Sequence, residues 1–222
     1  MRVRKLAVIG LVVVSGALGA CRHSGGAGTT VNAAANPWFL AATTGAQSDL
    51  DAAKKSGSSV SEHESRNRYT PLHVAAMAGN VNAVKFILAS GGNVDGLDED
   101  GRTPLMMALF KSQGQSAAAL IDSNANLEVR DREMKTALMF AAQYGQVDAI
   151  RAMIKRKVNL DAQRDTGATA LIFAADRGQV EAARVLVEAG ASKSLRDKRG
   201  RSALDFALAK NHSELAKLLK AE

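Results

Sequence analysis

The sequence predicts an all-α solenoid, in which short helix–turn–helix units stack in one direction. Three observations predict it. A ten-residue pattern recurs at a constant interval of 33 residues, beginning at Thr70, Thr103, Thr136, Thr169 and Ser202. Each copy joins a residue that can cap a helix to an alanine-rich apolar stretch, and a second apolar helical pattern follows it. Such periods are typical of repeat proteins, because one unit cannot bury its apolar face alone.

The first helix of each unit begins after the repeated Thr or Ser, whose hydroxyl can accept a hydrogen bond from an amide of the first turn. Pro71 and Pro104 follow at the position where a missing amide hydrogen has no cost. Recurring apolar residues predict its buried face: Leu72, Leu105, Leu138, Leu171 and Leu204, with Ala75, Ala108, Ala141, Ala174 and Ala207. A left-handed glycine is expected to end the helix at Gly79, Gly145 and Gly178.

The second helix of each unit is predicted to begin near Asn82, Gln115, Asp148, Glu181 and Glu214. Acidic or polar residues there suit the positive end of a helix. Four positions depart from the pattern. Ser112 and Asn211 replace the glycine that ends the first helix, Met134 replaces a turn glycine, and Lys157 stands where the second helix would end in glycine or asparagine. A left-handed lysine at position 157 costs about 1 kcal/mol.

The motif Thr-Pro-Leu-His-x-Ala-Ala at Thr70 and the 33-residue period resemble the ankyrin repeat family. The resemblance implies an ankyrin-repeat solenoid of about five repeats, whose connecting loops project as fingers. We name them finger 1 to finger 4, at residues 90–102, 122–135, 155–168 and 188–201. Asn36-Pro37, Ala41-Ala42 and Gly45 imitate the motif and predict a degenerate N-terminal capping repeat. The expected repeat domain is 36–222, with repeats at 36–69, 70–102, 103–135, 136–168, 169–201 and 202–222.

Residues 1–20 are typical of a secretory signal peptide, with a basic start followed by the uncharged, apolar Leu6–Ala20. Leu18-Gly19-Ala20-Cys21 resembles a bacterial lipoprotein lipobox, which implies a lipid on Cys21, the only cysteine. A plain signal peptide is the alternative. Residues 21–35 are predicted to be the lipidated cysteine and a flexible tether. By the same resemblance, Arg22 favours the outer membrane. The expected location is the bacterial cell envelope, anchored by lipid and facing the periplasm.

The composition supplies little for chemistry. The formal charge of +7 falls to +4 without the three basic residues of the leader, since 26 basic residues then face 22 acidic ones. Basic residues are not interleaved with aromatic ones, so we expect no nucleic acid partner. We find no catalytic set and expect no enzyme, no cofactor and no metal. Glu62-His63-Glu64 is the best metal candidate but lacks a fourth ligand. The resemblance gives His73 a structural role, hydrogen bonding between loops.

The resemblance places a protein-binding surface on the concave face, formed by finger tips and the exposed side of each first helix. The implied residues are Met77, Phe110, Lys111, Gln143, Tyr144, Asp176, Arg177, Arg102, Arg132, Lys135, Arg199 and Arg201. An alternative for Phe110 is that it fills a gap in the irregular second repeat. Early fingers are acidic and later ones basic, which favours an acidic partner, although solvated finger charges give the same pattern.

The expected function is protein–protein interaction by a monomer anchored in the membrane. The first specific version is an immunity protein that inhibits a toxin acting in the periplasm. One alternative is a scaffold or stabiliser of a periplasmic enzyme, such as a stress-defence catalase. Another is an enzyme with an unrecognised site.

Overall fold

The computed structural model describes residues 36–220. The predicted leader, the lipobox with Cys21 and the tether lie outside these residues. The described part forms helices and no β-strand, with one isolated bridge between Arg196 and Ser202. The helices are α1 (Pro37–Thr44), α2 (Gln47–Lys55), α3 (Pro71–Ala78), α4 (Val81–Ala89), α5 (Pro104–Phe110), α6 (Gly114–Asp122), α7 (Ala137–Gln143), α8 (Val147–Lys155), α9 (Ala170–Arg177), α10 (Val180–Glu188), α11 (Ala203–Ala209) and α12 (Ser213–Lys220).

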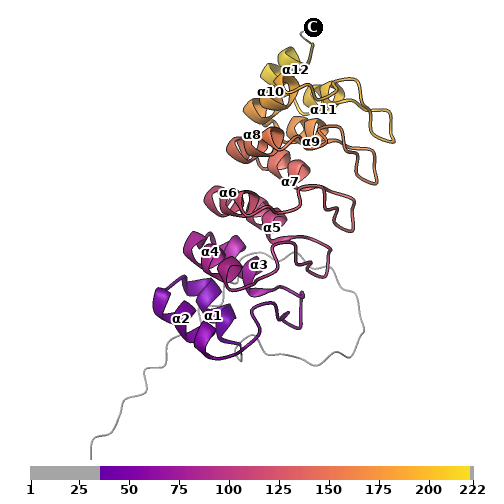
Figure 1. The fold of residues 1–222 in the computed structure, drawn as a ribbon. Coiled ribbons are helices and arrows are strands. Elements are labelled where there is room, and N and C mark those ends of the chain that lie inside the picture. Colours follow the sequence, from indigo (N-terminus) through magenta and orange to yellow (C-terminus); the bar gives the residue numbers. More distant parts are fainter. Residues whose placement is uncertain (1–35, 221–222) are drawn as a thin grey trace, which may run out of the picture.

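The helices stack in two layers along one axis (Figure 1). Each odd-numbered helix packs against the next odd-numbered helix, and from α4 onward each even-numbered helix packs against the next even-numbered one. The fingers project from the side of the odd-numbered layer (Figure 1). This arrangement confirms the predicted all-α solenoid of helix–turn–helix units. Within residues 36–220, no helix is both long and apolar enough to cross a membrane.

The core follows the repeated sequence positions. Leu72, Leu105, Leu138 and Leu171 are buried, and all five motif alanines are fully buried. Alanine has no side chain beyond Cβ, so neighbouring first helices approach closely there. Leu204, in the last repeat, is only partly buried. Ile87, Ile150 and Leu186 fill the space between the two layers.

Most predicted helix starts are confirmed, with one exception. The side chains of Thr70, Thr103, Thr169 and Ser202 accept a hydrogen bond from the amide three residues later. Asn36 also caps α1, but it accepts from the Trp38 amide, two residues later. Thr136 occupies the cap position, but its side chain accepts no such bond. The Met139 amide donates to the Thr136 carbonyl oxygen instead, at 3.1 Å.

The four departures from glycine adopt the left-handed conformation that their positions predict. The φ angles are 57° at Ser112, 61° at Met134, 58° at Lys157 and 59° at Asn211. A β-carbon is unfavourable there, so each position stores strain that glycine would relieve. The chain therefore keeps the repeat geometry where its local sequence opposes it.

Candidate functional site

The odd-numbered helices and the fingers lie on the same side of the stack (Figure 1), which is the side that the ankyrin resemblance names the concave face. The sequence-predicted residues near the ends of these helices lie at its surface, either exposed or half-buried. They are Met77, Phe110, Lys111, Gln143, Tyr144, Asp176 and Arg177. The predicted finger residues are likewise accessible: Arg102, Arg132, Lys135, Arg199 and Arg201. All twelve residues are therefore at least partly accessible to solvent.

Phe110 and Tyr144 form an aromatic pair across two successive repeats. Their ring centroids are 5.5 Å apart and the rings are almost perpendicular, at 88°. Phe110 keeps 38 % of its surface exposed, and the Lys111 ammonium lies 5.1 Å from its ring centroid. Phe110 is therefore partly accessible at the surface of the irregular second repeat and is not fully buried in it. Burial raises the pKa of Tyr144, so its hydroxyl stays neutral and available for hydrogen bonding near neutral pH.

Cations from the fingers lie over phenylalanine rings of the odd-numbered helices. Lys135 lies 5.6 Å from the Phe140 centroid and 5.7 Å from the Phe173 centroid. Arg164 lies 5.9 Å from Phe173, and Arg201 lies only 4.2 Å from Phe206. Sequence reasoning missed these pairs. The signal was available, because the three phenylalanines recur at the 33-residue period.

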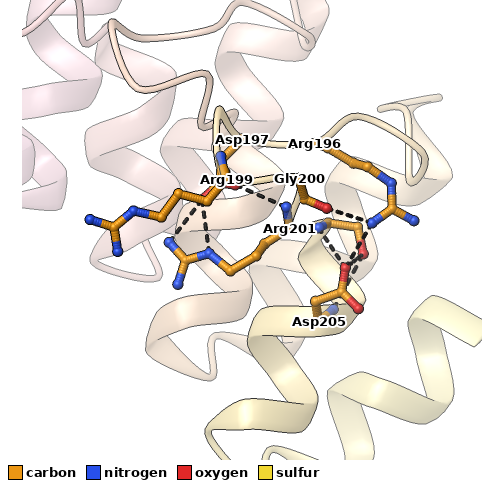
Figure 2. Close-up of polar contacts among 7 residues, drawn as sticks. Arg196, Asp197, Arg199, Gly200, Arg201 and Asp205 are labelled. Carbon is orange, nitrogen blue, oxygen red and sulfur yellow. Dashed lines mark hydrogen bonds and ion pairs between the residues drawn. The ribbon is translucent and has the colours of Figure 1, made fainter.

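A buried aspartate organises three of the four fingers. Asp98 Oδ1 accepts hydrogen bonds from the amides of Asp100 and Arg102, both at 2.8 Å. Asp131 and Asp197 repeat this pattern 33 and 99 residues later, with distances of 2.8–2.9 Å. Figure 2 shows Asp197 within this arrangement. A carboxylate that accepts two amide hydrogen bonds holds the loop in one shape.

Finger 3 lacks this aspartate, because Arg164 occupies the equivalent position. The backbone there is the same, since the Arg164 amide donates to the Ala168 carbonyl as Asp131 does to Lys135. Arginine has no acceptor, so it cannot bind the loop amides. Its side chain instead contacts Asp165 at 2.7 Å and Glu133 at 3.2 Å. Sequence reasoning also missed this exchange, although the period places Arg164 in register with the three aspartates.

Glu133 is held ionised between two cations. The Lys135 ammonium lies 2.8 Å from its carboxylate, and the Arg164 guanidinium lies on the same oxygen. The hydrogen bond from Lys135 lowers the pKa of Glu133, and the charges of Lys135 and Arg164 act in the same direction against its partial burial. The carboxylate therefore links finger 2 to finger 3.

A groove of about 560 Å³ lies between finger 3, finger 4 and the helices α9 and α11. Phe173 and Phe206 line its apolar part, and Arg164 and Arg201 lie above these rings. Arg201 also forms two contacts with Asp197 Oδ2, at 2.8 and 3.1 Å. The Arg199 side chain extends away from this cluster (Figure 2). The groove thus combines aromatic surface with fixed and free cations.

The metal candidate does not assemble. Glu62 accepts from the Asn36 side chain, Glu64 accepts from the Asn67 amide, and His63 Nδ1 lies 2.9 Å from the Arg68 carbonyl oxygen. Among residues 36–220, no group of three or more His, Cys, Asp or Glu side chains is arranged to hold a metal ion. The three neighbours in sequence therefore serve separate local contacts.

Comparison with known proteins agrees with the geometry. The family model described as "Ankyrin repeats (3 copies)" matches residues 38–131, 112–197 and 138–222. No curated protein matches this chain at a significant level. The matched segments together cover the whole helical stack, including most of the degenerate N-terminal unit. The chain therefore belongs to the ankyrin repeat family.

Proposed function

We propose that the concave face of this chain binds and inhibits a protein partner at the bacterial cell envelope, with Cys21 as the lipid anchor. Ankyrin repeats are protein–protein interaction modules, so the family supports a protein partner for this chain. The specific role proposed is that of an immunity protein, whose partner is a toxin acting in the periplasm. The lipobox-like Leu18-Gly19-Ala20-Cys21 supports the envelope location.

The Phe110–Tyr144 pair carries the choice of surface. The exposed 38 % of Phe110 would be removed from water by a partner that covers it, and this burial would favour binding. Aromatic residues dominate the energy of protein interfaces, because they bury a large area while losing few rotamers. Tyr144 adds a neutral hydroxyl, and Arg177, on the next repeat, adds an exposed cation. Together they provide apolar contact, hydrogen bonding and charge across three successive repeats.

The proposal is tested by capture of partners after crosslinking in membranes, with mass spectrometry of the captured proteins. The variant combines Phe110→Ala, Tyr144→Ala and Arg177→Ala. Its matched control combines Lys85→Ala, Lys155→Ala and Lys217→Ala, which lie exposed on even-numbered helices. We expect one dominant partner with the wild type and with the control, and its loss with the variant.

The captured partner is then purified and its activity is measured with and without this chain. Immunity requires that wild-type chain suppresses the activity and that the triple variant does not. The same partners in the wild type and in the variant would show that another face binds them. A partner whose activity is unchanged or stabilised would replace the inhibitory role by a scaffolding one.

A further inference from the structure

We propose that the groove between finger 3 and finger 4 binds an extended acidic segment of the protein partner through its carboxylates. The inference rests on the proposed function, because it assumes that the concave face binds a protein. It goes further by naming the chemistry recognised and the repeats that recognise it. Two independent observations carry it, the exchange at Arg164 and the unpaired cations at the rim of the groove.

Arg164 occupies a position where its own repeat pattern calls for aspartate. Three fingers fold around Asp98, Asp131 and Asp197, and each accepts two loop amides. Finger 3 gives up those bonds, and its contact to finger 2 is the longest of the series, 3.5 Å from the Asp165 amide to the Glu133 carbonyl. The equivalent contacts are 2.8–2.9 Å. A chain that keeps a locally unfavourable residue in a regular array indicates a functional demand there.

Arg164 also replaces a cation that finger 3 lacks at its end. Fingers 1, 2 and 4 end in Arg102, Lys135 and Arg201, whereas finger 3 ends in the buried Ala168. Arg164 supplies the missing cation and places it over the Phe173 ring. The exchange therefore keeps a cation over the Phe173 ring of the groove, and finger 3 loses the two amide hydrogen bonds that an aspartate would accept.

The groove has donors left for a ligand. Arg164 contacts Asp165 through Nε and Glu133 through Nη2, and a guanidinium carries five N–H donors. Lys198 and Arg199 are exposed at the rim, and in the described part of the chain no carboxylate lies within 4.0 Å of either cation. Asp197 is already engaged by Arg201 and by two amides. Asp165, Asp176 and Asp197 also line the groove, and Arg164 and Arg201 are paired with carboxylates. A ligand carboxylate would therefore meet its unpaired cations at the rim, at Lys198 and Arg199.

The shape favours a peptide segment over a membrane surface. Arg164 keeps only 18 % of its side chain exposed and belongs to finger 3, where it lines the groove that this finger forms with finger 4. A flat bilayer can touch finger tips but cannot enter such a groove, whereas an extended chain can place alternate side chains into it. The acidic finger 1, with the accessible Glu99 and Asp100, repels the same segment and so sets its direction along the stack.

The test uses the full chain and a fluorescein-labelled twelve-residue peptide of alternating Glu and Gly, read by fluorescence anisotropy. The reference peptide carries Gln in place of Glu. The groove variant is Arg164→Asn with Arg199→Gln, and the matched control is Lys155→Gln with Lys217→Gln. We expect the Glu peptide to bind about tenfold more tightly than the Gln peptide, and the groove variant to lose most of this preference. The control removes the same charge from even-numbered helices and should retain it.

The thermal midpoint of Arg164→Asn gives a second readout, because Asn Oδ1 can accept the loop amides. A midpoint equal to or above that of the wild type supports Arg164 as a ligand-binding residue. A clearly lower midpoint would overturn that assignment, since it would make Arg164 a stabiliser of its loop. Equal affinity for the two peptides would overturn the groove as a binding site for acidic segments. An equal loss of the preference for Glu in the control variant would overturn it too. A third result would also overturn it: the chain sediments with phosphatidylglycerol vesicles, the groove variant does not, and neither binds the Glu peptide.

The groove variant is also carried through the crosslinking experiment. Loss of the dominant partner supports the inference. If the groove variant retains that partner and the Phe110/Tyr144/Arg177 variant loses it, the groove does not bind the partner's acidic segment. The proposed function would then remain intact.

Discussion

His73 Nε2 lies 3.0 Å from the carbonyl oxygen of Arg102 and ties the first helix of its repeat to the end of finger 1. The Thr70 amide donates to His73 Nδ1 at 3.1 Å, so the proton of the neutral ring is on Nε2, which donates to Arg102. The resemblance to ankyrin repeats implied this role for His73, and the geometry confirms it. The ring is fully buried.

The buried state of His73 predicts a loss of stability in mild acid. Burial lowers the pKa of His73 to about 4, below the usual 6.5. Between these values the unfolded chain binds a proton that the folded chain excludes, so stability falls as pH falls from about 6.5 to 4. The loss should reach about 3 kcal/mol, measured by urea unfolding at several pH values. His73→Gln should unfold more easily at pH 7 but lose less stability across this window. Parallel losses in both proteins would exclude His73 as the cause.

Lys157→Gly is expected to stabilise the chain. Lys157 has a φ of 58°, where a β-carbon costs about 1 kcal/mol and glycine does not. The thermal midpoint should therefore rise. The control, Lys155→Gly, places glycine in the last turn of α8 and should lower the midpoint. If Lys157→Gly fails to raise the midpoint, the strain at this turn is not what limits stability.

Gly145→Ala should destabilise more than its φ of 64° explains. A β-carbon at Gly145 would lie 2.4 Å from the Gln179 Oε1 of the next repeat, so the neighbouring side chain would have to move. Gly57→Ala is the matched control, because its φ is 73° and no atom lies within 4 Å of the added carbon. We expect about 1 kcal/mol for Gly57→Ala and a larger loss for Gly145→Ala, by chemical denaturation. Equal losses would mean that Gln179 moves freely aside.

Phe110→Ala should separate binding from folding. Phe110 is exposed while its neighbour Leu109 is fully buried, so Leu109→Ala should cost about 2–5 kcal/mol and Phe110→Ala much less. A double-mutant cycle with Tyr144→Ala should give a coupling of about 0.5–1.5 kcal/mol, as edge-to-face aromatic pairs do. Additive losses would show that the two rings contribute independently.

The concave surface was predictable in outline and not in detail. The repeat period places Phe110, Tyr144 and Arg177 near the ends of successive first helices, so their shared surface follows from the sequence. Their contacts do not. Whether Phe110 is exposed or fills the core depends on how closely α5 and α7 approach, and that distance is set by packing between repeats.

Local chemistry made much of the fold readable from the sequence. The period located the units, the hydroxyl residues located the helix starts, and the turn register gave left-handed conformations even to Lys157 and Met134. These features involve residues close in the chain, where steric and hydrogen-bonding preferences act directly. Only the stacked structure decided that the Thr136 side chain does not cap, that Arg164 contacts Asp165 and Glu133, and that cations lie over Phe173 and Phe206. Those outcomes depend on distances between repeats, which the packing of many side chains determines together.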